Sequence, residues 1–445
     1  MLAQSTGAPS SELPPAVYAT AATCASSTLP PAVYATAATC ESNALLPRST
    51  RPRLRTVALS LVLAVLSCTA QGFGQELIRS ETEWSEQKLR RHLVAFSNDD
   101  RLAAVTDVDF STQPHSHSIK IHEVATWKVI AKRTIRDESE VQTFDAQSSG
   151  KVAFLPSGSE LVLCDQPRGQ TTVWDIASDA TRVVSRPPLK LRSSNDAPRP
   201  IYLASLSHDG SCIVLSEPEK NRTVIRVQRL DDGEILLEDV IGDWIARQAM
   251  FNQDGSAVFA VGERYDDRKK RFSLRVYRWD LQSGKLTKQW GPFPLNGTRV
   301  RGNPRDFGHH ALSPDGQILA TTQHGNFILL TEVATGRTQV VGPHPGNRQA
   351  VATFWVGTPD CDVAWFAFAP GQNLLATGAI GSPIVRLWPT GSGGEAGQLE
   401  QPDTLSVQDL VSSPSGQLLG VTCMGNKPIW DWSLNIWRLS AKTSQ

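Results

Sequence analysis

The chain has 445 residues, about three times the roughly 150 residues of a typical domain, so it can bury one large core or several. It carries 44 Lys and Arg residues against 44 Asp and Glu residues, which gives a formal net charge of zero. This balance excludes the strongly basic surface that neutralises nucleic-acid phosphates, so we expect no nucleic-acid partner. With 40% hydrophobic and 20% charged residues, most of the chain is predicted to be globular.

The first 50 residues are low in complexity. The twelve letters LPPAVYATAATC at residues 13–24 occur again without change at residues 29–40, between flanks rich in Ser, Thr and Pro. Two copies are too few for a solenoid, which needs about three repeats. We therefore predict a disordered extension over residues 1–50. The alternative is translated upstream sequence in front of a later true start.

Residues 51–70 resemble a signal peptide. Several arginines precede the apolar run VALSLVLAVL at residues 57–66, and small residues follow it. Ten apolar residues are too few to span a bilayer, which takes about 20. We therefore expect export to the periplasm, the cell surface or the medium, while a fortuitous apolar stretch in a cytoplasmic protein is the alternative. The letters VLSC at residues 65–68 also resemble a bacterial lipobox, in which case a lipidated Cys68 would attach the chain to a membrane.

From about residue 90 the chain repeats one unit. Each copy has an apolar strand, a tight turn such as Pro314-Asp315-Gly316, a second strand, a variable loop, a third strand, a second turn and a last strand. Pro and Gly supply the backbone angles that such turns need. The third strands align at intervals of 49 to 57 residues, and Trp stands at four of the seven aligned positions: Trp174, Trp279, Trp388 and Trp437. The following residue is acidic in four copies: Glu123, Asp175, Asp280 and Glu332.

Seven units of four short antiparallel strands predict an all-β fold, a seven-bladed β-propeller over residues 71–445. A single small sheet cannot bury both of its faces, whereas a closed ring covers each sheet with two neighbours and protects the edges. The periodic Trp side chains are expected to lie between the blades as structural core residues.

The turns FSNDD, LSPDG and SPSG and the strands VWDI, RWDL, RLWP and IWRL resemble those of the WD-repeat family of seven-bladed propellers. The resemblance covers about five-sixths of the chain and implies the fold rather than a function. The period is longer than the family's usual 40–45 residues, and the Gly-His pair before each first strand is largely missing. We therefore expect the blades to rely on apolar packing, without the Asp–His–Ser/Thr–Trp network familiar in that family.

The last unit lacks its outermost strand, because the chain ends soon after SLNIWRLSA. Residues Gln75–Ser80 (QELIRS) have strand composition and lie before the first complete unit. We predict that they pair with the last blade and close the ring.

The long connections fall between second and third strands and between blades, and in a propeller both classes open on one face. Loops on a rigid scaffold commonly carry binding residues, so this face is the predicted protein- or peptide-binding surface of a monomeric propeller. The candidate residues are aromatic or basic: Trp430, Trp432, Lys427, Arg268, Lys269, Lys270, Arg301 and Arg305. Exposed aromatic residues favour recognition, although Trp430 and Trp432 can equally pack beneath their loop.

No catalytic motif is present: the chain has no GxSxG, no GxxxxGK and no HExxH. We predict a non-catalytic exported scaffold without a cofactor. A ligand- or peptide-sensing module of an envelope complex is a related hypothesis. A lactonase-like or sugar-processing enzyme is the alternative, with weak candidates at the channel mouth: Asp107, Asp109, His115 and Glu263.

The histidines are not expected to form a metal site, because His115 and His117 lack a third ligand nearby in the sequence. His309, His310 and His344 are expected to be solvated or to cap turns.

Overall fold

The computed structural model describes residues 73–82, 89–109, 116–135, 152–165, 170–185, 202–219, 222–266, 271–295, 310–323, 327–344, 363–379, 381–391, 394–402, 404–425 and 432–441. All regular secondary structure in these residues is β-strand, in seven four-stranded antiparallel sheets. No helix within these ranges is long and apolar enough to cross a membrane. The predicted extension and the signal-like segment lie outside the described residues.

We number the sheets in chain order. Sheet 1 has β2 (Leu89–Phe96), β3 (Leu102–Asp109), β4 (Ser116–Glu123) and β5 (Val129–Ile135), and sheet 2 has β6 (Val152–Phe154), β7 (Glu160–Asp165), β8 (Gln170–Asp175) and β9 (Thr181–Ser185). Sheet 3 has β10 (Tyr202–Leu206), β11 (Cys212–Glu219), β12 (Arg222–Arg229) and β13 (Ile235–Ile241), and sheet 4 has β14 (Ile245–Phe251), β15 (Ala257–Asp266), β16 (Arg271–Asp280) and β17 (Lys285–Leu295). Sheet 5 has β18 (His310–Leu312), β19 (Ile318–Gln323), β20 (Phe327–Glu332) and β21 (Thr338–Val341), and sheet 6 has β22 (Val363–Ala369), β23 (Leu374–Ala379), β24 (Ile384–Pro389) and β25 (Gly397–Glu400). Sheet 7 has β26 (Thr404–Ser412), β27 (Leu418–Gly425), β28 (Trp432–Ala441) and, at its outer edge, β1 (Phe73–Thr82).

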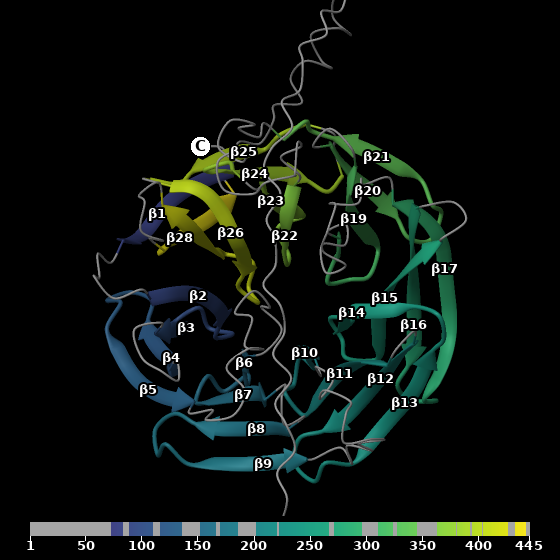
Figure 1. The fold of residues 1–445 in the computed structure, drawn as a ribbon, viewed down its shortest axis with the longest axis horizontal. Helices are drawn as coiled ribbons and strands as arrows, with labels where there is room; N and C mark the ends of the chain where they lie inside the picture. Colours follow the sequence, from purple (N-terminus) through teal and green to yellow (C-terminus); the bar gives the residue numbers. More distant parts are fainter. Residues whose placement is uncertain are drawn as a thin grey trace, which may run out of the picture. The chain divides into compact units, whose positions relative to one another are not determined.

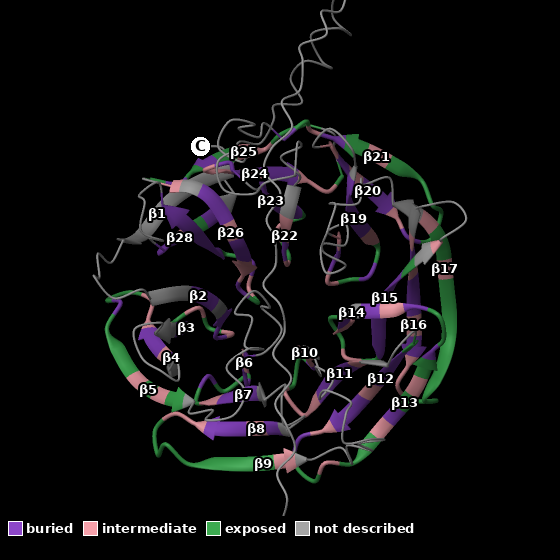
Figure 2. Ribbon diagram, in the orientation of Figure 1, coloured by how far each residue is buried: buried purple, intermediate pink, exposed green. Residues whose placement is uncertain are grey.

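The sheets stand side by side in a ring, with the first strand of each innermost (Figure 1). The described core consists of seven apolar clusters, and each of them joins two neighbouring sheets. One cluster joins sheet 7 to sheet 1 through Leu418 and Ile436 on one side and Leu93 and Val105 on the other. The inner strands are accordingly buried, whereas the outermost strands carry most of the exposed residues (Figure 2). The fold is therefore a closed seven-bladed β-propeller, as the repeat predicts.

The prediction of ring closure by the N-terminal strand is confirmed. β1 pairs antiparallel with β28, with Gln75 opposite Leu439 and Ser80 opposite Asn435. The strand is longer than predicted, since it covers residues 73–82 rather than 75–80. The last sheet thus contains strands from both ends of the propeller, and the outer backbone edge of β28 is paired.

The periodic tryptophans lie in the sheets as predicted. Trp174, Trp279 and Trp388 are at most 3% exposed, and Trp437 is half-buried against the cluster between sheets 6 and 7. The indole N–H of each tryptophan donates to a side-chain oxygen: in the same order, Asp179 Oδ1 at 2.9 Å, Asp239 Oδ2 at 2.7 Å, Thr377 Oγ1 at 2.8 Å and Gln401 Oε1 at 3.2 Å. Each buried indole therefore has a hydrogen-bond acceptor without a shared motif.

The expectation that the complete family-type network does not form stays a prediction, although sheet 6 contains two contacts that resemble part of it. Besides the bond from Trp388 to Thr377, the ring of His344 lies at this point, with Nε2 3.3 Å from the carbonyl oxygen of Thr377. His344, expected to be solvated or to cap a turn, is only 1% exposed, so the first of these two alternatives is wrong. The segment after β21 returns to β23, and the polar contact to Thr377 O allows the imidazole to be buried there.

The acidic residue after the third strand stabilises the second turn. Asp175 Oδ1 accepts hydrogen bonds from the backbone N–H and the hydroxyl of Ser178, both at 2.8 Å. Asp280 makes the same pair of contacts with Ser283 at 2.8 and 2.7 Å. These bonds favour the ionised carboxylates, so the pKa values of Asp175 and Asp280 lie below their usual range.

The first turn of most sheets is stabilised by hydrogen bonds from its own side chains. In sheet 5 the Ser313 hydroxyl donates to Asp315 Oδ1 at 2.5 Å and accepts the N–H of Ile318 at 2.8 Å, while Asp315 Oδ1 accepts the N–H of Gln317. The same pattern occurs in sheets 1 and 3, where the bonds from Ser97 and Ser207 lower the pKa values of Asp99 and Asp209. The stability that these two carboxylates contribute is present above their unfolded pKa near 4 and is lost as the pH falls below it.

We expect Ser313→Ala to lower the free energy of unfolding by about 1–3 kcal/mol, because the partly buried N–H of Ile318 loses its acceptor. Ser283→Ala is the matched control, since Ser283 is exposed and its removal is expected to cost about 0.5 kcal/mol or less. Urea unfolding of both variants measures the difference. Equal losses would contradict a structural role for the first turns.

Candidate functional site: the channel mouth at the first turns

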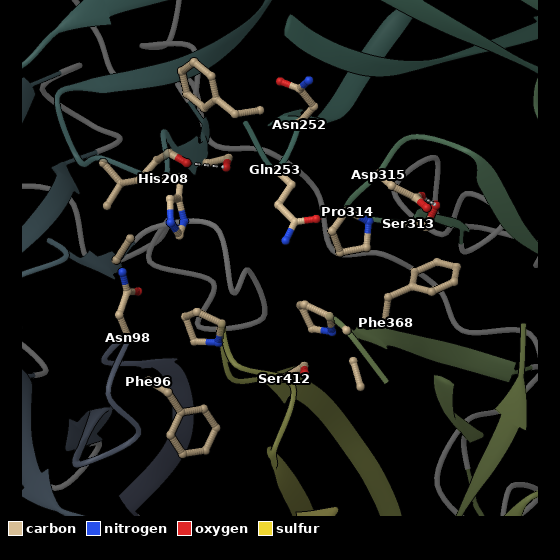
Figure 3. A pocket seen from close by; sticks show the side chains of 18 of the residues that line it. Phe96, Asn98, His208, Asn252, Gln253, Ser313, Pro314, Asp315, Phe368 and Ser412 are labelled. Atoms are coloured by element: carbon tan, nitrogen blue, oxygen red, sulfur yellow. Dashed lines mark hydrogen bonds between the residues drawn. The ribbon is translucent and has the colours of Figure 1, made fainter. Parts of the chain in front are cut away.

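The first turns of all seven sheets meet at one end of the ring and enclose a cavity of about 560 Å³ (Figure 3). This cavity, which we call the channel mouth, is in the size range of small-ligand pockets. Beneath the turns it is lined by the ends of the inner strands, where buried aromatic rings pack between the blades: Phe96, Phe154, Phe251 and Phe368. The turns at the rim therefore lie above buried side chains that pack between the blades.

One turn position from each sheet lines the rim. The residues, in ring order from sheet 1 to sheet 7, are Asn98, Pro156, His208, Gln253, Pro314, Pro370 and Pro414. In Figure 3 Gln253 lies beside Pro314, while Asn98 and His208 lie across the open space from Pro314. Sheets 5, 6 and 7 thus form a proline arc, and three of the four remaining sheets present an amide or an imidazole.

Contacts between neighbouring turns fix the rim. Gly210 has a φ of +71°, and a Cβ there would lie 2.2 Å from Cδ of Pro156 in the preceding turn. Gly416 has a φ of +70°, and a Cβ there would lie 2.0 Å from the carbonyl oxygen of Pro370. Only glycine suits such positions. The Ser415 hydroxyl also donates to Asp100 Oδ2 and links the last turn to the first.

The channel mouth is nearly free of charge. Of the 28 described residues that line it, only Asp315 is Asp, Glu, Lys or Arg, whereas these residues make up 20% of the chain. The carboxylate of Asp315 is held within its own turn by Ser313 and Gln317. The other side chains at the rim are the amides of Asn98 and Gln253, the imidazole of His208 and proline rings, which offer hydrogen-bonding and apolar contacts.

The weak catalytic candidates do not form a common site in the described residues. Asp107 lies in sheet 1 and is paired with Lys120 at 2.6 Å, while Glu263 lies in sheet 4 and is paired with His310 at 3.1 Å. The His310 side chain is 6% exposed, so its predicted solvated position is wrong; the buried carboxylate of Glu263 gives the imidazole a partner. The side chain of Asp109 and all of His115 lie outside the description. Within the described ranges no three metal-ligating side chains gather.

Of the predicted binding residues, only Trp432 is described. It begins β28, is 5% exposed, and its ring centroid lies 4.8 Å from that of His92. Trp432 therefore packs inside the molecule, which was one of its two predicted roles. The remaining candidates lie outside the described residues: Lys427, Trp430, Arg268, Lys269, Lys270, Arg301, Arg305 and Cys68.

From the sequence, the binding and catalytic candidates are predicted on the loop face, around the channel opening on that side, and the opening formed by the first turns is missed. Its signal is present in the seven turns, because the second residue of each turn is either Pro, as in Pro314, or a polar residue, as in Gln253. The turns look like connectors until the ring brings them together. A comparison of their second positions across the repeats would have identified the rim.

No protein-family profile matches the chain. Among curated proteins it is 28% identical over 145 residues to "Activating molecule in BECN1-regulated autophagy protein 1B" of Danio rerio, a match that covers 33% of the chain and 10% of that protein. It is 30% identical over 131 residues to the corresponding protein 1A of Danio rerio, over 29% of the chain and 9% of that protein. The matches thus span about a tenth of the length of these relatives. The chain is a seven-bladed β-propeller with local similarity to part of two autophagy-activating molecules.

Proposed function

We propose that the chain is a non-catalytic scaffold that binds other proteins, on a propeller of the WD-repeat type. The observation that supports it most is the channel mouth, where seven interlocked turns present neutral hydrogen-bonding and apolar groups around an open cavity. Rigid surfaces of this kind bind at low entropic cost. The tryptophan–threonine bond of sheet 6 supports the WD-repeat lineage.

The similarity to the Danio rerio proteins supports the same class of function. Their names describe activating molecules in BECN1-regulated autophagy, which are regulators rather than enzymes by name. The activity and partners of those much longer proteins apply to this chain only as part of the proposal.

We also propose that the chain is exported through residues 51–70, with Cys68 as the site of lipid attachment. The loop face, with Trp430 and the basic loop residues, is proposed as a second contact surface.

Capture followed by reconstitution tests the scaffold proposal. The full chain is immobilised, proteins that it retains from an extract of its own cells are identified, and each is purified and mixed with the chain. A stoichiometric complex on size-exclusion chromatography is the expected result. Failure of every retained protein to reform a complex would contradict the proposal, as would turnover of a small substrate by the purified chain.

A further inference from the structure

We propose that the channel mouth binds an uncharged peptide segment of a protein partner, with an apolar side chain against the proline arc and peptide amides bonded by Asn98, His208 and Gln253. This inference rests on the proposed scaffold function and specifies the chemistry of the partner. It concerns the end of the ring formed by the first turns, and the loop residues predicted from the sequence take no part in it.

The charge of the lining selects against a charged ligand. A charged group that enters a pocket loses hydration, and only an opposite charge or several hydrogen bonds offset that cost. The described lining residues include no Lys or Arg, and Oδ1 of Asp315 already accepts hydrogen bonds from Ser313 Oγ and the backbone N–H of Gln317. Among the described lining residues an anion therefore finds no Lys or Arg as a counter-charge, and a cation finds only the carboxylate of Asp315, which already accepts two hydrogen bonds.

The hydrogen-bonding groups of the rim match a peptide backbone. A side-chain amide and a neutral imidazole each offer both a donor and an acceptor, as a peptide bond does. Asn98, His208 and Gln253 extend into the mouth from sheets 1, 3 and 4 (Figure 3). Three such groups at separate points of the rim can fix the direction of an extended segment.

The other side of the rim is apolar and rigid. Pro314, Pro370 and Pro414 come from three consecutive sheets, and a proline ring has a fixed φ and little conformational entropy to lose on binding. A cavity of about 560 Å³ has room for one large side chain with its flanking peptide groups, and it is too small for a folded element. The occupant is therefore a loop or terminal segment.

The test uses three pools of capped hexapeptides and the immobilised full chain. One pool has uncharged residues only at its four central positions, the second includes Lys, and the third includes Asp. We expect the chain to retain the uncharged pool roughly tenfold more than either charged pool, as quantified by mass spectrometry. Gln253→Lys places a cation at the rim, so retention is expected to shift roughly tenfold from the uncharged pool toward the Asp pool.

Gln289→Lys is the matched control, because it adds the same charge at an exposed position of the outer strand β17. It is expected to leave the order of the pools unchanged, and the melting temperatures of both variants confirm folding. The inference is overturned if the uncharged pool is not retained, if all pools are retained equally, or if the two variants behave alike. A reconstituted partner complex that tolerates Gln253→Lys would overturn this inference and leave the scaffold proposal standing.

Discussion

Deletion of residues 71–84 is expected to lower the melting temperature by about 10 °C or more. The deletion removes β1 and with it the backbone pairing along β28 from Thr82 opposite Ser433 to Phe73 opposite Ala441. Each lost hydrogen bond contributes about 1 kcal/mol, and several such losses shift the melting temperature by many degrees. The outer edge of β28 would also be left unpaired, which promotes association between copies.

Deletion of residues 13–26 is the matched control for this experiment. It has the same length and removes one copy of the duplicated segment, outside the propeller repeats. We expect its melting temperature to equal that of the full chain. Differential scanning calorimetry of both deletions, with light scattering to detect association, measures the effect. An unchanged melting temperature for the first deletion would contradict closure by β1.

Asp409→Asn is expected to stabilise the protein above neutral pH. Asp409 lies in the innermost strand of sheet 7 and is 5% exposed, with Oδ1 accepting the N–H of Leu410 at 2.8 Å. Its Oδ2 is buried and has no hydrogen-bond partner among the described residues. Burial therefore disfavours the carboxylate and raises the pKa of Asp409 to about 7.

The sign of the pH dependence follows from that shift. Between pH 4 and pH 7 the folded protein holds a proton on Asp409 that the unfolded chain releases, so stability falls as the pH rises through this range. One pKa unit corresponds to about 1.4 kcal/mol, so the wild type is expected to lose roughly 3 kcal/mol from this group between pH 5 and pH 8. Asn cannot ionise and keeps the acceptor for Leu410, so the variant lacks this loss.

Urea unfolding at pH 5 and pH 8 measures the effect as the stability difference between variant and wild type. Asp254→Asn is the control, because Asp254 is an exposed turn residue whose bonds to Ser256 and Asn252 hold its pKa below the usual range. Its effect on stability is expected to be the same at both pH values, since its carboxylate is ionised throughout this range. A pH-independent difference for Asp409→Asn would show that the carboxyl group titrates normally.

The fold could be predicted from the sequence because its determinants are local and repeated. The first turn is specified by Ser, Asp and Gly within a few residues, as in Ser313, Asp315 and Gly316, and the second turn by an acidic residue and a Ser such as Asp280 and Ser283. Such contacts recur in several sheets and leave the same letters in each. Ring closure could be predicted because a sheet of three strands leaves an edge that needs a partner.

The site could not be predicted in the same way, because its residues meet only after the ring has closed. Asn98 and Gln253 are about 150 positions apart in the sequence, and each alone is an unremarkable turn residue. The sequence instead led to a binding site predicted from the aromatic and basic residues of the long loops. Trp432 shows why this criterion is weak, because it is buried. A Trp next to a loop can complete the interface of two blades as well as bind a partner, and in this case it packs on His92.

The same reasoning explains the misplaced histidines. His310 and His344 stand beside long connections, which predicts solvent exposure, yet both side chains are buried. A carboxylate from the neighbouring sheet, that of Glu263, pairs with His310, and a backbone carbonyl of β23 contacts His344. Partners that come from another strand or sheet are distant in the sequence, so the residues around each histidine do not predict them.

Hydrogen–deuterium exchange of the full chain tests most directly whether the seven sheets form one closed ring. The amides of Phe73–Thr82 that face β28 should be protected, as should those of Trp432–Ala441, which are paired on both sides, and Gln253→Lys should leave both segments unchanged. Exchange of residues 73–82 at the rate of an unstructured peptide, beside a protected β28, would show that the ring is open at sheet 7 and would contradict the account.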